Sequence, residues 1–252
     1  MSKNTITSLM ITFVVISFIH AGYSQVRYGV RGGLSFVNFS EDMGGTEMMD
    51  FEGVPIEIVI DQSSRKVFNI GGLVEFRLSP IFSLQVNALY NQKGAKLGGN
   101  FNMVLVEQGI PVSISGSVED EIDLTYLSFP VLGKLEFGES DIKPYIIAGP
   151  EFGFLLSATD HAKATAKGEA MGMTVGPFTA EEENDIKESF DTFELAINLG
   201  AGLVMPLGGV DLFVDGQYSF GLTKINKEST AGSEDIKNQV IMIDVGLLFG
   251  GK

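Results

Sequence analysis

The chain has 252 residues and a formal net charge of −15, with 31 glycines, 19 phenylalanines and neither cysteine nor tryptophan. The acidic balance excludes nucleic acid as a partner, because phosphates require a basic protein face. The lack of cysteine excludes disulfides, thiolate nucleophiles and cysteine-bound metals.

The N-terminal segment has the organisation of a secretory signal peptide. A positively charged start is followed by an apolar run, ITSLMITFVVISFI over residues 6–19, and then by small residues near Ser24. Cleavage is predicted between Ser24 and Gln25, with an uncleaved anchor helix as the alternative. The predicted division is a signal peptide over residues 1–24 and an exported domain over residues 25–252.

Alternation of apolar and polar residues predicts β-strands along the exported domain. The clearest case is Phe193–Met205, FELAINLGAGLVM, in which every odd-numbered residue is apolar and the even-numbered ones are mostly small or polar. Period two is typical of a strand, and the run has about the length that a tilted strand needs to cross a bilayer. Eight such strands are predicted, at Val26–Phe39, Phe68–Leu78, Phe82–Lys93, Leu124–Phe137, Pro144–Ala158, Phe193–Met205, Val210–Leu222 and Ile236–Phe249.

The connections between these strands alternate between long and short. The short ones lie near residues 79–81, 138–143 and 207–209, and the long ones near residues 40–67, 94–123, 159–190 and 223–235. This alternation is typical of outer-membrane barrels, in which short turns face the periplasm and long loops face outside. Residues 101–118 alternate around a central turn, which predicts a hairpin that extends beyond the membrane. Residues 54–60 and 162–175 are expected to extend in the same way.

Charged residues fall on one face of nearly every predicted strand, and the opposite face is apolar through the middle of the strand. A soluble barrel places its apolar residues inside. A Lys or Arg that faces lipid at the bilayer midplane costs about 2–4 kcal/mol, so here the apolar face is expected to point outward. The predicted fold class is an all-β, eight-stranded antiparallel up-and-down transmembrane β-barrel with long extracellular loops and short periplasmic turns. The polar network predicted for its interior comprises Arg31, Glu75, Arg77, Lys134, Glu136, Glu151, Glu194, Asp215 and Asp244.

Aromatic residues near both ends of the predicted strands indicate two interfacial girdles. The inner girdle comprises Tyr28, Phe76, Phe82, Phe137 and Phe249, and the outer one comprises Phe36, Phe68, Tyr90, Phe193 and Phe220. Pro130 and Pro150 lie within predicted strands, and proline cannot donate to a ladder. A bulge or a local break is therefore expected at each proline.

Five stretches together resemble the PorT-like outer-membrane β-barrel proteins of Bacteroidetes, also described as the outer membrane protein beta-barrel domain family. They are GVRGGLSFVNFS at Gly29–Ser40, FSLQVNALYNQKGAKL at Phe82–Leu97, LTYLSFPVLGKLEF at Leu124–Phe137, PYIIAGPEFGFLLSA at Pro144–Ala158 and LFVDGQYSFGLTKI at Leu212–Ile225. The resemblance implies an outer-membrane location and a barrel, without one assigned activity. Its name-giving member is linked to a protein secretion system, and the family offers no catalytic motif to match.

Catalytic and metal-binding signals are weak in this chain. His161 is the one histidine after the signal peptide, and no metalloprotease or serine-hydrolase motif occurs. Solvent exposure is the favoured interpretation of His161. Acidic groups in the first and third long loops allow divalent cation binding as an alternative to a solvated rim, but no EF-hand pattern is present. We therefore expect no catalytic site, no cofactor and no bound metal.

The expected function is that of a non-enzymatic outer-membrane barrel. Eight strands leave an interior that side chains just fill, which favours a salt-bridged plug over a selectivity path for the charged network. The long loops then become the expected working parts, in partner binding, secretion support or envelope integrity. The alternative is a narrow porin-like channel for small solutes or ions. The expected partners are outer-membrane lipid and another envelope or extracellular protein, and the oligomeric state stays open.

Overall fold

The computed structural model describes residues 25–41, 44–51, 54–107, 110–227 and 235–250, so the predicted signal peptide lies outside the described residues. These residues form strands and one short 3-10 helix. In chain order the elements are β1 (Gln25–Phe39), β2 (Gly45–Phe51), β3 (Val54–Ser63), β4 (Arg65–Arg77), β5 (Phe82–Glu107), β6 (Ile110–Glu136), β7 (Lys143–Ala170), β8 (Met173–Asp185), η1 (Lys187–Ser189), β9 (Phe193–Leu207), β10 (Val210–Gly221) and β11 (Asn238–Phe249).

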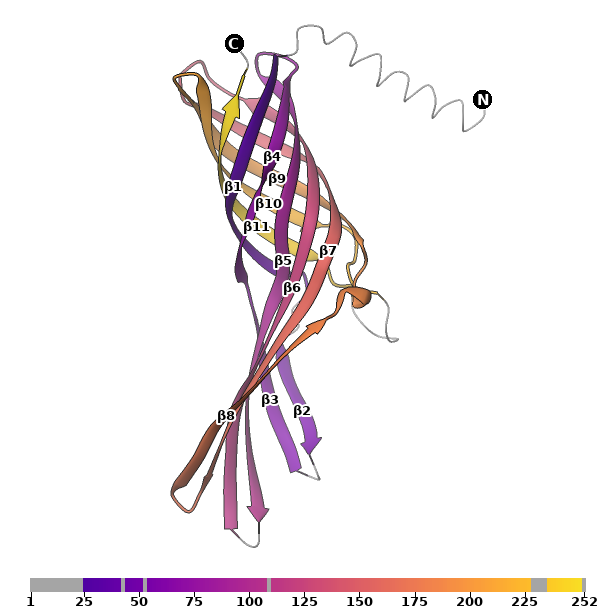
Figure 1. Ribbon diagram of the computed structural model, residues 1–252, viewed down its shortest axis with the longest axis vertical. Helices are drawn as coiled ribbons and strands as arrows, with labels where there is room; N and C mark the ends of the chain where they lie inside the picture. Colours follow the sequence, from indigo (N-terminus) through magenta and orange to yellow (C-terminus); the bar gives the residue numbers. More distant parts are fainter. Residues whose placement is uncertain (1–24, 42–43, 52–53, 108–109, 228–234, 251–252) are drawn as a thin grey trace, which may run out of the picture.

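Eight of the strands close into a barrel (Figure 1). The ring runs β1–β4–β5–β6–β7–β9–β10–β11 and back to β1, and every neighbouring pair is antiparallel. These strands correspond to the eight predicted ones, so the predicted barrel is confirmed. Closure pairs the backbone of every strand on both sides, as a bilayer requires. Among the described residues, no helix has the length and apolarity to cross a membrane.

Three barrel strands continue far beyond the ring. β5 and β6 stay paired from Phe82↔Leu135 out to Glu107↔Ile110, which confirms the predicted hairpin. β7 continues to Ala170 and pairs with β8, while β3 pairs with β5 and β2 with β3. We call this six-stranded projection, in the order β2–β3–β5–β6–β7–β8, the extracellular sheet. Its described residues are 45–51, 54–63, 95–107, 110–122 and 159–185 (Figure 1).

The extracellular sheet confirms the strands expected at residues 54–60 and 162–175, and it corrects the prediction that the rest of the connections near residues 40–67 and 159–190 are loops. Most of the described residues in them belong to β2, β3, β7 and β8. Glycine, proline and clustered acids interrupt the alternation in these segments, so that a strand signal is visible only in residues 54–60 and 162–175. Pairing with the long hairpin β5–β6 supplies the stability that such short segments do not have alone.

The two strand prolines interrupt the ladders without shifting their register. The β5–β6 pairing has the same register on both sides of Pro130, and the β6–β7 pairing resumes unshifted after the residues next to Pro150. The side-chain amide of Asn87 donates to the Pro130 carbonyl at 3.3 Å. A local break is therefore present at each proline without a bulge, which confirms the predicted interruption in the second of its two forms. The register shift lies instead between Thr125 and Tyr126.

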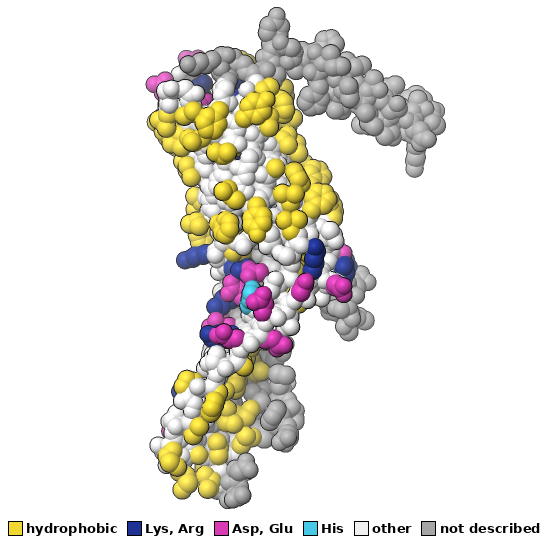
Figure 2. Space-filling view, viewed as in Figure 1, with side chains coloured by type: hydrophobic (Ala, Val, Ile, Leu, Met, Phe, Trp, Pro, Cys, Tyr) yellow, Lys and Arg dark blue, Asp and Glu magenta, His cyan; other side chains and the backbone are white. Residues whose placement is uncertain are grey.

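The outer surface of the barrel is an apolar belt (Figure 2). Exposed apolar side chains alternate with buried ones on every barrel strand, and they include Val30, Leu34, Ile70, Ile146, Leu199, Val214, Ile243 and Val245. Exposed aromatic residues lie at both ends: Tyr28, Phe137 and Phe249 at one, and Phe68, Tyr90, Phe193 and Phe220 at the other. In Figure 2 a band of charged side chains separates this belt from the apolar end of the extracellular sheet.

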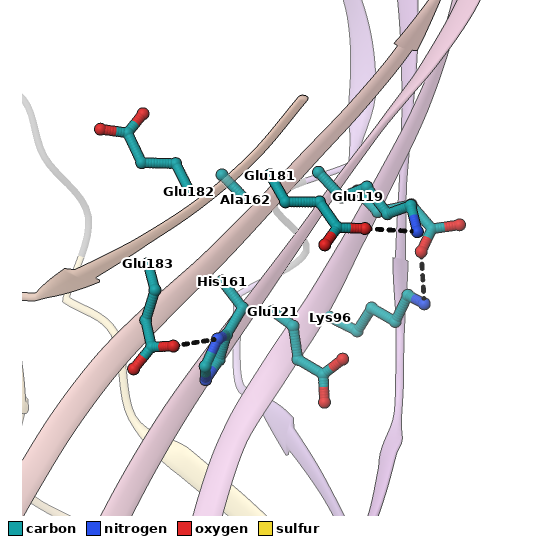
Figure 3. A pocket seen from close by; sticks show the side chains of 9 residues that line it. Lys96, Glu119, Glu121, His161, Ala162, Glu181, Glu182 and Glu183 are labelled. Atoms are coloured by element: carbon teal, nitrogen blue, oxygen red, sulfur yellow. Dashed lines mark hydrogen bonds and ion pairs between the residues drawn. The ribbon is translucent and has the colours of Figure 1, made fainter. Parts of the chain in front are cut away.

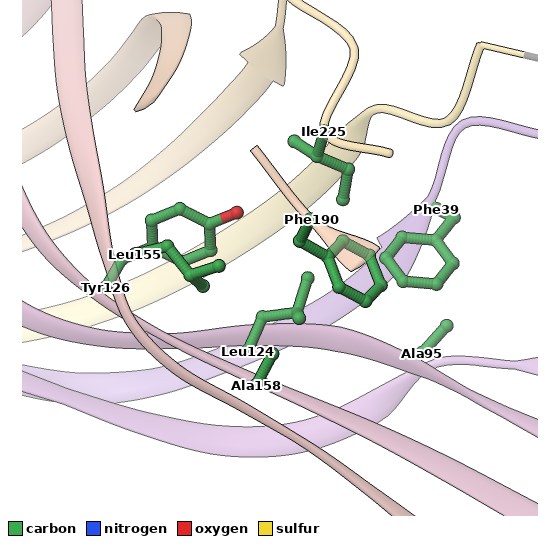
Figure 4. Packing of buried hydrophobic residues seen from close by; sticks show 8 residues of the cluster. All are labelled: Phe39, Ala95, Leu124, Tyr126, Leu155, Ala158, Phe190 and Ile225. Atoms are coloured by element: carbon green, nitrogen blue, oxygen red, sulfur yellow. The ribbon is translucent and has the colours of Figure 1, made fainter. Parts of the chain in front are cut away.

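A cluster of buried apolar residues closes the outer mouth of the barrel (Figure 4). Phe190, which follows η1, and Ile225, which follows β10, pack there against residues of the barrel wall. Backbone bonds hold these two connections together, since Asp191 N donates to Ile225 O at 2.7 Å and Ile225 N to Ile236 O at 2.9 Å. The cluster comprises Phe39, Ala95, Leu124, Tyr126, Leu155, Ala158, Phe190 and Ile225, and we call it the cap.

Candidate functional site: the filled lumen and the extracellular sheet

Buried ion pairs fill the barrel lumen in three clusters, of which the first lies at the periplasmic end. Lys134 on β6 places its Nζ 3.1 Å from Glu75 Oε2 and 3.0 Å from Glu136 Oε1. Arg27 on β1 pairs with the same two carboxylates, with 3.1 Å between its Nη2 and Glu136 Oε1. Arg77 reaches Glu136 Oε2 from the rim at 3.3 Å. Two buried cations thus share two buried carboxylates, so the loss of either cation leaves an uncompensated charge.

The second cluster lies at the middle of the lumen and surrounds one arginine. Arg31 on β1 pairs with Asp244 on β11, and its Nη2 lies 3.0 Å from Asp215 Oδ1 on β10. The Tyr145 hydroxyl donates to Asp215 Oδ2 at 2.7 Å, and the Gln217 amide donates to Asp215 Oδ1 at 2.9 Å. Each carboxylate therefore has a charged partner, and Asp215 also accepts two neutral hydrogen bonds.

The third cluster lies directly beneath the cap. Lys93 on β5 places its Nζ 3.0 Å from both Glu151 Oε1 on β7 and Glu194 Oε2 on β9. The Asn198 amide donates to Glu151 Oε2 at 2.8 Å, and the Asn238 amide donates to Glu194 Oε2 at 3.2 Å. Four strands are thus joined around one ammonium group on the inner side of the cap.

Each cluster also sets a cation near an aromatic ring. Lys134 Nζ lies 4.3 Å from the centroid of the Tyr145 ring, and Lys93 Nζ lies 5.2 Å from that of Tyr126. The Arg31 guanidinium lies 5.7 Å from the Phe213 ring centroid. The rings occupy lumen space between the ion pairs and add cation–π attraction. Ion pairs, rings and cap together fill the interior, as an eight-stranded barrel of this size allows.

The structure brings all nine predicted network residues together in the lumen. Eight of them are buried, and Arg77 keeps 26% of its side chain exposed at the periplasmic rim. Two cations missing from the predicted network, Arg27 and Lys93, are as central as any of the nine. Both stand on the polar face of their strands, so the alternation could have found them. The tyrosines Tyr126 and Tyr145 gave no such signal, because an aromatic residue is common on either face.

The face of the extracellular sheet that continues the lumen wall is apolar. Register places on it Ile58, Ile60, Leu97, Phe101, Met103, Leu105, Val112, Ile114, Val118, Ile122, Met173, Val175 and Phe178. Met173, Val175 and Phe178 are 67%, 59% and 66% exposed. We call this surface the apolar face. A one-sided antiparallel sheet ordinarily buries such a face against the rest of the protein, and here no described element covers it.

Near the barrel the opposite face of the sheet, which we call the polar face, carries ion pairs (Figure 3), whereas farther out it also exposes Val59, Val104 and Val106. Lys96 Nζ lies 2.9 Å from Glu119 Oε2, and Lys163 Nζ lies 2.8 Å from Glu181 Oε1. The hydrogen bond from Lys96 lowers the pKa of Glu119, and the bond from Lys163 lowers that of Glu181. His161 stands half-exposed on β7, 3.3 Å from an Asp123 oxygen. The predicted exposure of His161 is confirmed, although it lies on a strand and not in a loop.

This polar face forms a shallow hollow of about 310 Å³, lined by Lys96, Glu119, Glu121, His161, Ala162, Lys163, Glu181, Glu182 and Glu183. Glu119, Glu121 and Glu181 pair with Lys96, Arg65 and Lys163, and Glu183 Oε2 lies 3.7 Å from His161 Nδ1, whereas Glu182 points away from the others in Figure 3. Within the described residues, no group of three or more Asp, Glu, His or Cys side chains could hold a metal ion. The hollow is therefore a solvated ion-pair ladder.

The fold and its apolar belt agree with the comparison to known families. The family model of the outer membrane protein beta-barrel domain matches residues 20–227. The chain belongs to this family. The family places the protein in the outer membrane.

The chain is also similar to several solved structures. Neisserial surface protein A is 11% identical, with a TM-score of 0.36 over 89% of this chain and 97% of that chain. Ail, the attachment invasion locus protein of Yersinia pestis, is 13% identical, with a TM-score of 0.30 over 88% and 98%. OprG from Pseudomonas aeruginosa is 12% identical, with a TM-score of 0.32 over 92% and 99%. No curated relative matches the sequence.

Proposed function

We propose that this barrel is a non-enzymatic surface protein that binds a macromolecular partner through its extracellular sheet. The observation that carries the proposal is the apolar face, which projects beyond the membrane and stays exposed at Met173, Val175 and Phe178. Exposed apolar surfaces of this extent are typical of interaction sites. In the same proposal residues 1–24 are a signal peptide that is removed on export, and residues 25–252 are the working domain.

The channel alternative is disfavoured by the contents of the lumen. Water and ions would have to pass the cap and three layers of ion pairs, in which Lys93, Arg31 and Lys134 each hold two carboxylates. The refolded protein is expected to be silent in a planar bilayer. Steady conductance steps that change with a Lys134 or Glu136 substitution would restore the channel reading.

Truncation of the extracellular sheet tests the binding function directly. The register pairs Gly98 with Glu119 and Thr165 with Thr179, so each long hairpin can be shortened there with a two-residue turn while the barrel pairing is kept. Cells with the truncated protein are expected to lose partner binding, while heat-shifted gel mobility shows an intact barrel. Binding that survives the truncation would contradict the proposal.

A secretion role is the second candidate, supported by the resemblance to PorT-like barrels at stretches such as Leu124–Phe137. This role predicts that a deletion strain loses exported proteins from its medium. Return of secretion with the truncated protein would assign the secretion role to the barrel itself, and would separate it from partner binding by the sheet.

A further inference from the structure

The apolar face contains a lane of small residues between two rows of large ones. On β7 the residues of this face are Ala162, Ala164, Ala166, Gly168 and Ala170. The flanking strands present larger side chains, Val112, Ile114 and Val118 on β6 and Met173, Val175 and Phe178 on β8. Neighbouring strands lie about 4.8 Å apart, so the lane is about 10 Å wide between the two rows. This width fits one extended polypeptide.

The ionisable groups on the apolar face are all acidic. Among its described side chains the titratable ones are Asp120, Asp160 and Glu182, and none is Lys, Arg or His. Glu182 is exposed and takes part in no described ion pair, whereas Glu181 and Glu183 on the same strand contact Lys163 and His161 on the polar face. Glu182 therefore places an unpaired carboxylate beside the lane, whereas Glu169, an exposed acid on the polar face without a described ion pair, has Lys167 two residues away on the same face.

This charge pattern decides between the possible occupants. A second copy of the chain would bring three more carboxyl groups against Asp120, Asp160 and Glu182, and an anionic lipid headgroup or phosphate would be repelled in the same way. A polypeptide that alternates apolar side chains with Lys or Arg is complementary to this face, because its apolar side chains fit the lane and its cations attract the carboxyl groups.

We propose that the apolar face is a docking site for a cationic amphipathic polypeptide segment in extended conformation. The segment lies along the β7 lane, its apolar side chains contact β6 and β8, and its cations pair with Glu182 and the barrel-proximal carboxyl groups. This inference rests on the proposed binding function and adds the face used and the chemistry of the partner. Complementary charge also raises the rate of encounter with such a segment.

Three synthetic peptides of about ten residues, the length of a typical strand, serve as probes of the protein in neutral-lipid nanodiscs. One alternates Val and Lys, one alternates Ser and Lys, and one alternates Val and Glu. The Val-Lys peptide is expected to bind saturably and at least about tenfold more tightly than either other peptide. Equal binding of the Val-Lys and Ser-Lys peptides would overturn the proposal, because it would reduce the interaction to attraction by an acidic protein.

Two matched pairs of variants locate the site. Glu182→Gln is expected to weaken Val-Lys binding several-fold, and Glu181→Gln, one residue away on the opposite face, to leave it unchanged. Ala164→Leu is expected to fill the lane and abolish binding, and Thr165→Leu to leave it unchanged. Heat-shifted gel mobility verifies that each variant barrel is folded. Equal effects within either pair would overturn the assignment to the apolar face.

Three further outcomes identify the occupant and separate this inference from the proposed function. If the protein forms dimers in the nanodiscs and Ala164→Leu dissociates them, then the occupant of the lane is a second copy of the chain. That result would overturn the proposal. Absence of Val-Lys binding, together with loss of cellular binding on sheet truncation, would sink the cationic-segment inference and leave the proposed function standing. Cellular binding that survives truncation would sink the proposed function itself.

Discussion

The barrel lumen and the extracellular sheet are built from the same strands with opposite polarity. On β6 the residues that face inward include buried polar ones within the membrane, such as Ser128 and Lys134 beside Leu132, and are mostly apolar beyond it, such as Ile114 and Ile122. The register of β6 with β5 does not change between these two parts. The backbone thus sets which residues share a face, and the surroundings of the face decide whether those residues are apolar.

The surrounding lipid explains why the lumen is polar, and the surrounding water explains why the sheet can be different. Within the bilayer the outward face must be apolar, so charges are confined to the lumen and have to be paired there. Beyond the bilayer the outward face meets water and carries exposed ion pairs such as Lys163–Glu181. The apolar face therefore does not have to carry the charged residues of these strands. We therefore expect the loss of a charged side chain to lower the free energy of unfolding much more in the lumen than on the sheet. We also expect the replacement of an exposed apolar residue by a charged one to destabilise the barrel but not the sheet.

The largest expected effect is the loss of a lumen cation. Lys134→Met leaves Glu75 and Glu136 with one cation fewer in a buried site, and breaking a buried pair costs about 3–5 kcal/mol. The free energy of unfolding, measured in urea with heat-shifted gel mobility as the readout, should fall by this amount. Lys163→Met breaks a solvent-exposed pair on the sheet, which water and salt screen, and should cost far less stability. Equal losses for the two variants would remove the distinction between the regions.

The next effect is that of a charged residue placed either on the lipid-facing belt of the barrel or on the apolar face of the sheet. Leu199 is 56% exposed in the middle of β9, so Leu199→Arg places a charge against lipid and should cost about 2–4 kcal/mol. Phe178 on the apolar face is 66% exposed but meets water, so Phe178→Arg should change stability by about 0.5 kcal/mol or less. Measured refolding in lipid vesicles checks both values. A large loss for Phe178→Arg would mean that the sheet is covered within the protein.

A smaller effect follows from packing density. A Cβ at Gly202 in the lumen would lie 2.6 Å from the Tyr145 ring and 2.6 Å from the Asp215 Cβ, whereas a Cβ at Gly98 on the sheet meets no atom within 4 Å. Overpacking of a filled interior costs about 1–3 kcal/mol, so Gly202→Ala should be destabilising by that amount. Gly98→Ala should be near neutral in the same urea titration. A neutral Gly202→Ala would show that the lumen contains free space.

The same contrast explains which features were predictable from the sequence. Period two in segments such as Phe193–Met205 identified the barrel strands, because lipid enforces one apolar face along their whole length. The lumen network followed from the opposite face. Neither face of the sheet lies against lipid, so neither face has to be apolar along its whole length. β2 and β8 therefore show little more than local alternation in the sequence, and they form by pairing with β3 and β7. The cap was unpredictable for the same reason, since Phe190 and Ile225 come from irregular connections.

The last effect depends on pH and concerns a carboxyl pair that differs from those of the lumen. Burial beside Asp160 raises the pKa of Asp120 on the extracellular sheet to about 7. In the unfolded chain this carboxyl titrates near its ordinary pKa of about 3.9. Between these values the folded sheet binds more protons, so its stability falls as the pH rises from about 4 to about 7 and is constant above. The protonated form is the stabilising one, in contrast to the lumen carboxylates, which face cations.

Asp120→Asn should remove this pH dependence and make the sheet as resistant at pH 8 as the wild type is at low pH. The ratio of wild-type to Asp120→Asn proteolysis of the β5–β6 hairpin, taken at each pH, cancels the pH dependence of the protease. This ratio should rise from about pH 5 to a plateau above about pH 7. Glu119→Gln is the matched control, because the pKa of Glu119 is lowered by Lys96 and its titration lies below the tested window. A ratio independent of pH would show that Asp120 ionises freely, and that the acids of the apolar face are as well solvated as those of the polar face.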